Sequence, residues 1–432
     1  MNVSKDAMPK MPRTLVISYN SFLSSNANGR TLINLFENWD PSCLAQFYMS
    51  SDYPDFFGCS SYYRVTDEDA LKSLLKKHEG GQIQPQKKYK ADMRGVTYTN
   101  LKRHRNNQMV RYFRQLVWET GKWESVSLYN WIESFSPEII LLFSGNNAFI
   151  DKFALKIASR YNIPIVLYNC EDYFLKEPKN NTLFARINKN HCDKTFKKTM
   201  RQVKGVIYNS FKLQKSYENV FGRKNDIVLM NAPSTEITKN TKRKCNGSIV
   251  YLGNVAVGRE YALAEIADAL AGRGLTLDIY GNILSESTEQ TLLSHKNIRY
   301  HGVVSYSECC AIMKDSRLLV HGESFCNNHE REIRHAFTTK FADCLASETP
   351  LLVYAPSDIA LTEYIAKYDC AVLATSFEDL KTKLDKILDD DIYRAEILKN
   401  ARMTCLANHD KCKIDLDFKI FLSNIVFGEL DR

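Results

Sequence analysis

The chain has 432 residues, of which 44% are hydrophobic and 25% are charged, and its formal net charge is +8. This composition indicates a globular protein and argues against disorder, and the length suffices for two domains of the usual size. The opening segment MNVSKDAMPKMPR contains no apolar stretch, so we expect no secretory signal. No run approaches the roughly 20 apolar residues that cross a bilayer, so no membrane span is expected.

The twelve cysteines are scattered along the chain, many of them inside apolar segments. They form no C-x-x-C pair and no spacing that suits zinc. We interpret them as reduced packing residues, which indicates a cytoplasmic protein.

Strands and helices alternate along the chain. Most of the predicted strands are short, continuous apolar runs, which are typical of parallel sheets covered on both faces. In chain order they are residues 14–18, 138–143, 164–168, 205–209, 248–253, 275–281, 297–302, 317–322, 350–355 and 370–374.

One polar, basic segment interrupts this alternation. Residues 231–247, NAPSTEITKNTKRKCNG, read as an interdomain linker. The sequence therefore predicts an α/β protein with two Rossmann-like domains, residues 1–230 and 248–395, and a helical tail, 396–432, that packs back on the N-terminal domain. Ligands bind beyond the carboxyl ends of parallel strands, so we expect a cleft between the two domains.

A basic stretch lies between the first two long strands. From Lys87 to Arg114 it holds nine lysines and arginines and one acid, Asp92. Apolar residues at positions 109, 113, 116 and 117 recur at helical spacing, which predicts a basic amphipathic helix. A solvated face of a core helix, a contact with a membrane surface and a contact with nucleic acid remain open.

Two loops of the first domain carry candidate site residues. Asn28, Gly29 and Arg30 follow the first strand and open a helix, where free N–H groups can bind anions or sugar hydroxyls; a plain connector is the alternative. Glu171 and Asp172 follow the strand 164–168, and either cap a helix or take part in catalysis.

Two loops of the second domain also carry candidate site residues. Gly253, Asn254 and Arg259 stand between a strand and a helix, where an arginine can bind phosphate bidentately or lie on the surface. Residues 321–340, HGESFCNNHEREIRHAFTTK, are longer than a connector needs and rich in acids, bases and histidines, which indicates a site.

Four segments resemble the retaining GT-B glycosyltransferases of the glycosyltransferase group 1 family. TTKFADCLASETPLLV is similar to their P-x-K-x-x-E-Y-x-A-x-G-x-P segment, and SIVYLGNVAVGRE to their strand followed by G-R-x-x-x-x-K. NIRYHGVVSYSECCAIMKDSRLLVHGES matches their module of strand, G-V, helix and strand, and SFKLQKSYENVFG matches the end of their first domain. The resemblance covers most of residues 14–395.

The resemblance implies a donor site in the second domain. Asp343 takes the place of the carboxylate that binds the nucleotide ribose, and Arg259 that of the phosphate-binding lysine. Asn254 replaces the usual arginine, so Lys340 or Arg30 would supply the missing charge. Val303, in the G-V pair, and the glycine Gly253 complete the implied donor contacts.

The resemblance also implies catalytic positions. The paired-glutamate pattern E-x7-E appears as His335 and Asp343, so its first glutamate is a histidine, and Glu323 could take the sugar-binding role instead. Glu171 and Asp172 fall near the acceptor-side acid of the family. Glu348 stands where the family has a glycine.

The implied activity is transfer of a sugar from a UDP- or GDP-sugar, with retention at the anomeric carbon, to a glycan or lipid-linked acceptor. It requires no metal and no cofactor, because basic side chains and helix N-termini stabilise the departing diphosphate. Asp415 and Asp417 form a D-x-D pattern, which we expect on a solvated helix face and not at a metal. The implied setting is bacterial surface polysaccharide synthesis.

An acceptor carried by a lipid would place the enzyme in the cytoplasm, peripherally at the inner face of the membrane. Lys102, Arg103 and Arg105 are the predicted membrane contacts. A sugar-nucleotide epimerase that uses His335 and Glu323 as bases, or a non-enzymatic basic binding protein, is the alternative. A nicotinamide dehydrogenase is disfavoured because no strand is followed by G-x-G-x-x-G, and nucleic acid binding would leave the loops of the second domain unexplained.

Overall fold

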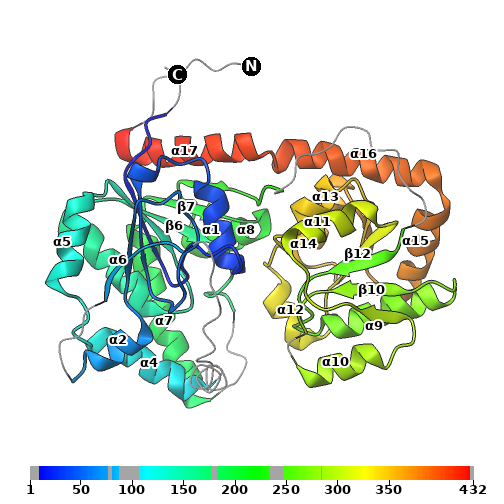
Figure 1. Ribbon diagram of the computed structural model, residues 1–432, viewed down its shortest axis with the longest axis horizontal. Helices are drawn as coiled ribbons and strands as arrows, with labels where there is room; N and C mark the ends of the chain where they lie inside the picture. The colour runs from blue at the N-terminus through cyan, green and yellow to red at the C-terminus, as the bar shows by residue number, and fades with distance from the viewer. Residues whose placement is uncertain are drawn as a thin grey trace. The chain divides into compact units, whose positions relative to one another are not determined.

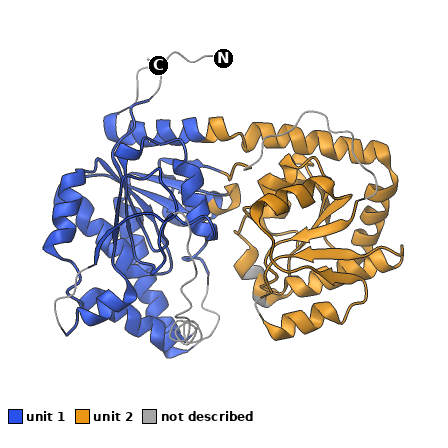
Figure 2. Cartoon of the chain, viewed as in Figure 1, with its two compact units in different colours: residues 1–209, 214–229, 415–432 blue, residues 210–213, 230–414 orange. Residues whose placement is uncertain are grey.

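The computed structural model describes residues 9–75, 80–86, 107–176, 182–233, 247–283 and 285–428. The chain forms two compact units (Figures 1 and 2). The first unit comprises residues 1–209, 214–229 and 415–432, and the second comprises 210–213 and 230–414.

Within the described ranges, the sheet of the first unit has eight strands in the order β4-β3-β2-β1-β5-β6-β7-β8. Neighbouring strands are parallel except β3 and β4, which are antiparallel. Strand β1 lies in the middle and pairs Thr14 with Leu44 on one side and with Ile139 on the other. The strands are β1 (Thr14–Ser18), β2 (Leu44–Tyr48), β3 (Ser61–Arg64), β4 (Gly81–Ile83), β5 (Ile139–Phe143), β6 (Ile165–Asn169), β7 (Gly205–Tyr208) and β8 (Asp226–Val228).

Helices flank this sheet. The last helix of the chain, α17 (Lys411–Phe427), packs on it from residue 415 onward, because the ring of Phe418 lies 5.3 Å from Phe36 and 5.4 Å from Trp39. The other helices are α1 (Ala27–Phe36), the 3-10 turn η2 (Pro41–Cys43), α2 (Asp67–Lys72), α4 (Gln108–Thr120), α5 (Val126–Phe135), α6 (Ala148–Tyr161), α7 (Leu183–Gln202) and α8 (Phe211–Phe221).

The second unit has a parallel sheet, with six strands among the described residues in the order β11-β10-β9-β12-β13-β14. Leu263, Leu277, Val320 and Leu352 form part of its buried apolar core. The strands are β9 (Ile249–Leu252), β10 (Leu277–Tyr280), β11 (Ile298–Tyr300), β12 (Leu318–Gly322), β13 (Leu351–Tyr354) and β14 (Val372–Ala374). The helices are α9 (Arg259–Ala271), α10 (Glu286–Leu293), α11 (Tyr306–Asp315), α12 (Asn327–Ile333), α13 (Phe341–Ala346), α14 (Ala360–Tyr368), α15 (Phe377–Asp389) and α16 (Asp391–Asn408).

All ten predicted strands are present, with ends within two residues of those expected. The predicted class, α/β with two Rossmann-like units, is confirmed. The prediction missed β2, β3, β4 and β8, and β4 departs from the parallel arrangement. Strand β2 was hidden by a buried glutamine, Gln46, whose amide donates to Ser18 Oγ and accepts from the Phe22 N–H; β4 and β8 are three-residue edge strands.

The described part of the chain has no helix long and apolar enough to cross a membrane. Every cysteine for which the structure gives a state is a free thiol. Most of the predicted linker, residues 234–246, lies outside the described ranges.

Candidate active site

Glycines bring the carboxyl ends of β9, β10 and β11 close together in the second unit. The Gly253 N–H donates to the Tyr280 carbonyl, and the Gly281 N–H to the Gly302 carbonyl, both at 2.8 Å. A Cβ on Gly281, whose φ is +146°, would lie 1.8 Å from the Gly253 carbonyl oxygen, so a side chain is sterically excluded there. Val303 follows this edge and is 72% exposed.

A bidentate ion pair lies beside this glycine edge. The Nε and Nη2 atoms of Arg259, the first residue of α9, donate to the carboxylate of Glu323 at 3.0 and 2.7 Å. Glu323 follows β12 directly and is buried. Arg259 Nη1 also donates to the Asn254 carbonyl at 3.4 Å, so each of its three nitrogens has a protein partner.

A histidine completes this cluster. His321 Nε2 lies 2.9 Å from Glu323 Oε1, and the His321 ring stacks on Tyr251. Burial acts to raise the pKa of Glu323, but the hydrogen bond from His321 and the charge of Arg259 outweigh it and lower that pKa to about 2. Burial acts to lower the pKa of Arg259, and the Glu323 charge raises it instead. Both groups are therefore charged at neutral pH.

Sequence reasoning placed Arg259 and Glu323 in one site but did not foresee that they bind each other, and it gave His321, the first residue of the candidate loop 321–340, no role of its own. The alternation of side chains along an extended strand would have paired His321 with Glu323, because residues two apart point to the same face.

Asp343 lies near the start of α13 and is buried. Its Oδ1 accepts a hydrogen bond of 2.8 Å from the hydroxyl of Tyr306, the first residue of α11. Lys340 is the N-cap residue of α13. His335 is buried in the segment between α12 and α13, where its carbonyl accepts from Ser210 Oγ at 3.3 Å.

The predicted anion site at the start of α1 is occupied by the chain itself. The Asn28 and Gly29 N–H groups donate to the side chain of Asn26 at 2.9 and 3.2 Å, and Arg30 Nε donates to the Ser24 carbonyl at 3.0 Å. A Cβ on Gly29 would lie 2.5 Å from the Leu23 carbonyl oxygen, so this glycine lets the helix pack against its own loop.

The two acids after β6 differ in environment. Asp172 Oδ1 accepts hydrogen bonds from the Leu175 N–H at 2.8 Å and from the Tyr217 hydroxyl at 3.1 Å. It therefore stabilises the turn that follows β6. Glu171 is exposed. Burial and the neighbouring Glu171 carboxylate raise the pKa of Tyr173.

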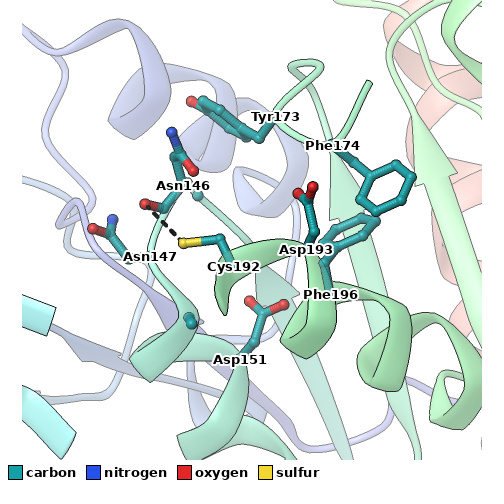
Figure 3. A pocket seen from close by; sticks show the side chains of 10 residues that line it. Asn146, Asn147, Asp151, Tyr173, Phe174, Cys192, Asp193 and Phe196 are labelled. Atoms are coloured by element: carbon teal, nitrogen blue, oxygen red, sulfur yellow. Dashed lines mark hydrogen bonds between the residues drawn. The ribbon is translucent and has the colours of Figure 1, made fainter. Parts of the chain in front are cut away.

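Figure 3 shows a shallow hollow in the first unit, about 260 Å³ including space open to solvent. It lies at the carboxyl ends of β5 and β6 and is closed on one side by α7. Its lining combines amides, acids and aromatic rings: Asn146, Asn147, Asp151, Tyr173, Phe174, Cys192, Asp193 and Phe196, with Gly145 and Ala148. Sequence reasoning missed the loop SGNN after β5, although it also follows a strand.

Asp151 is the deepest acid of this hollow and is almost fully buried. It accepts from the hydroxyls of Ser144 at 2.7 Å and Thr199 at 3.1 Å. Burial raises the pKa of Asp151 to about 7, and these two hydrogen bonds only partly oppose the shift.

The remaining predicted positions form no site among the described residues. Lys102, Arg103 and Arg105 lie outside the described residues. Asp415 is buried on α17 and accepts from Asn38 Nδ2 at 2.6 Å, so its expected place on a solvated face was wrong. The described residues contain no group of acids, histidines and cysteines that could hold a metal ion.

Residues 259–412 match the family model described as Glycosyl transferase-like. The matched range lies within the second unit and spans Arg259, Glu323, His335, Lys340 and Asp343. The glycosyltransferase resemblance expected from the sequence is confirmed over this range. A search of curated protein sequences gave no match.

Solved structures show the same fold over nearly the whole chain. HepE of Anabaena in complex with UDP-glucose is 13% identical, with a TM-score of 0.60 over 95% of this chain and 99% of its own. WaaG, a glycosyltransferase involved in lipopolysaccharide biosynthesis, is 12% identical, with a TM-score of 0.57 over 96% and 99%. A TarM variant of S. aureus is 15% identical, with a TM-score of 0.50, and the match spans 69% of this chain but only 58% of TarM. The two units together thus have the GT-B fold.

Replacing Arg259 with methionine should lower the free energy of unfolding by about 3 to 5 kcal/mol, because the buried Glu323 charge loses its partner. The double variant Arg259→Met/Glu323→Gln should regain a large part of this loss. Urea unfolding measures both. Arg273→Met, which removes a surface pair with Asp385 and Asp389, is the control and should cost less than about 1 kcal/mol. Equal losses at Arg259 and Arg273 would contradict a buried pair.

Asp151 makes stability depend on pH. Its pKa is about 7 in the folded protein and about 3.9 when unfolded, so the folded state binds more protons between these values and stability falls as pH rises from about 4 to about 7. Asp151→Asn should remove the contribution of Asp151 to this decrease in the free energy of unfolding, which amounts to at most about 4 kcal/mol. Urea unfolding of the parent and the variant at several pH values checks it, and parallel curves would refute the assignment.

Proposed function

We propose that the protein is a retaining, hexosyltransferase-like glycosyltransferase that moves a sugar from a nucleotide diphosphate donor, such as a UDP- or GDP-sugar, to a glycan or lipid-linked acceptor. It acts without a metal, in bacterial surface polysaccharide synthesis. The observation that carries the proposal is the glycosyl transferase-like match over residues 259–412. That range contains the buried cluster at the carboxyl edge of β9 and β12.

Donor binding belongs to the second unit in this proposal. The carboxylate of Asp343 binds the ribose diol, in exchange for or beside its present bond to the Tyr306 hydroxyl. Gly253 offers its carbonyl group, because its N–H already donates to Tyr280, and the exposed Val303 offers its backbone at the same edge. Lys340, at the start of α13, supplies positive charge for the diphosphate.

The role of Arg259 in turnover follows from its ion pair. When the bond between the anomeric carbon and the diphosphate oxygen breaks, negative charge develops on the diphosphate, and a preorganised cation there stabilises the transition state. Its bonds to Glu323 and Asn254 use three of its five N–H groups, so Arg259 can donate to that charge either with the Glu323 pair intact or after one of its bonds breaks. Retention requires the new bond from the acceptor oxygen to form on the face that the diphosphate leaves.

Acceptor binding belongs to the first unit in this proposal. The hollow of Figure 3 offers amide groups, acids and aromatic rings, which are the groups that bind sugar hydroxyls and pack on sugar faces. HepE was solved with UDP-glucose, and WaaG takes part in lipopolysaccharide biosynthesis, so both neighbours support this class of reaction. The cytoplasmic, membrane-peripheral location belongs to the same proposal.

The test is donor turnover by the purified protein. UDP- and GDP-sugars are each mixed with the protein, and thermal stability and free nucleotide are followed with and without EDTA. We expect one donor to raise the unfolding temperature, nucleotide release that EDTA leaves unchanged, and a product whose anomeric configuration by NMR equals that of the donor. No stabilisation by any nucleotide sugar would refute the function, loss of activity in EDTA would refute the metal-free reaction, and inversion would refute retention.

Asp343→Ala should weaken nucleotide binding by about 1.5 to 3 kcal/mol, the scale of a hydrogen bond to a charged group. Isothermal titration with the free nucleotide measures the change. Asp343→Asn keeps the shape of the side chain and separates the loss of charge from a loss of packing. Unchanged affinity in both variants would remove Asp343 from the donor site.

A further inference from the structure

Three helices of the first unit carry large apolar side chains that face solvent. They are α2, α4 and α7, and α4 packs against both of the others (Figure 1). The exposed apolar residues on α2, on the turn after it, on α4 and on α7, here called the α2–α4–α7 surface, are Leu71, Leu74, Leu75, Met109, Val110, Phe113, Leu116, Leu183 and Ile187. Leu75 is 92% exposed, Leu183 69% and Phe113 53%. Exposed apolar residues gathered on neighbouring helices mark interaction sites.

Specific contacts hold these helices together. Arg114 Nε and Trp118 Nε1 of α4 each donate to Asp67 Oδ1 of α2 at 2.7 Å. The rings of Tyr112 on α4 and Phe184 on α7 lie 5.9 Å apart. These contacts therefore fix the positions of the helices that carry the exposed residues.

Helix α4 has two unlike faces. Met109, Phe113 and Leu116 recur every three or four residues on the outer face and are exposed, whereas Gln115 and Trp118 lie on the opposite face and are buried. The sequence predicted this amphipathic helix, but the folded unit turns its apolar stripe outward, which is unfavourable in water unless another surface covers it.

The outer face of α7 changes from apolar to basic along the helix. Leu183 and Ile187 lie on the side opposite the buried Ala185 and Cys192, and exposed basic residues continue the same side at helical spacing. They are Arg186, Lys194, Lys197, Lys198 and Arg201.

We infer that the α2–α4–α7 surface, with the basic face of α7 beside it, docks on an anionic lipid membrane. Apolar side chains enter the boundary between headgroups and acyl chains, and the basic side chains beside them bind anionic headgroups. A stripe along one helix whose exposed charges are all positive suits a uniformly anionic surface better than a protein interface, which seldom enriches lysine.

Two of these helices, α4 and α7, turn their inner faces toward the hollow of Figure 3. Arg114 Nη1 on α4 donates to Asn147 Oδ1 at 2.9 Å, and Cys192 and Phe196 on α7 line the hollow. Under the proposed function, membrane docking by the outer faces would bring the head of a lipid-linked acceptor near these inner faces. The inference rests on the proposed function for its peripheral location, whereas the proposed sugar transfer is tested separately by donor turnover.

The test is co-sedimentation of the whole protein with vesicles of phosphatidylcholine alone or mixed with phosphatidylglycerol. We expect binding to the mixed vesicles only, weakened at about 1 M salt, where the Debye length is about 3 Å. Lys194→Gln/Lys198→Gln/Arg201→Gln should lower the partition coefficient about 100-fold, because each basic residue near the surface contributes a factor of about five. Phe113→Ser/Leu183→Ser should abolish binding at every salt concentration.

Matched variants on the second unit are the controls. Lys296→Gln/Lys314→Gln/Lys399→Gln removes the same charge, and Ile392→Ser/Met403→Ser removes two exposed apolar residues of α16; both should bind vesicles like the parent. No binding by the parent, or equal binding by test and control variants, would overturn the inference. A dimer in sedimentation velocity that Phe113→Ser/Leu183→Ser dissociates, without any vesicle binding, would overturn it too and assign the surface to a second copy of the chain. Donor hydrolysis should be unchanged in all variants, so failure here is separate from failure of the proposed function.

Discussion

The ion pair between Arg259 and Glu323 decides what the carboxyl edge of the second sheet can bind. Glu323 is buried, and its low pKa keeps it charged at any physiological pH, so the edge needs a cation beside it at all times. Arg259 satisfies that need with all three of its nitrogens. Under the proposed function, a diphosphate would meet a guanidinium whose charge is already balanced by Glu323, so further cations or a rearrangement of the pair would have to balance the diphosphate charge.

The ion pair affects how the positions at which the sequence departs from the family pattern are interpreted. With Asn254 where an arginine is usual and Glu323 bound to Arg259, the site has less net positive charge than a plain diphosphate clamp. Under the proposed function, Lys340 at the start of α13 supplies further positive charge for the diphosphate. A pair that opens only when the leaving group gains charge would contribute more to the transition state than to ground-state binding, which favours turnover over affinity.

The sequence predicted the fold well because local signals and tertiary packing agree. Continuous apolar runs such as 139–143 and 351–354 are buried on both faces, so composition alone identifies them. Gln46 is an exception. Its amide is buried, and three hydrogen-bond partners at and just after the end of β1 satisfy it. No local sequence pattern predicts those partners. The pairing of Arg259 with Glu323 was hidden for a similar reason, since 64 residues separate them and only the adjacency of β9 and β12 brings them together.

The first unit uses its polar groups differently from the second. Its leading helix N-terminus, which in many parallel sheets binds an anion, is capped by Asn26, so its donors are already used. The hollow of the first unit presents polar groups from the loops after β5 and β6 and from α7, the helix whose opposite face is basic and exposed. Binding of an uncharged sugar through amides and rings is consistent with that arrangement, because aromatic faces and amides need no net charge to bind hydroxyl groups. Lys194, Lys198 and Arg201 of the same helix lie on the side opposite the buried residues that line the hollow, whereas Lys197 lies over the Phe174 ring at 5.5 Å, so an anionic surface can reach the outer side of α7 without entering the hollow.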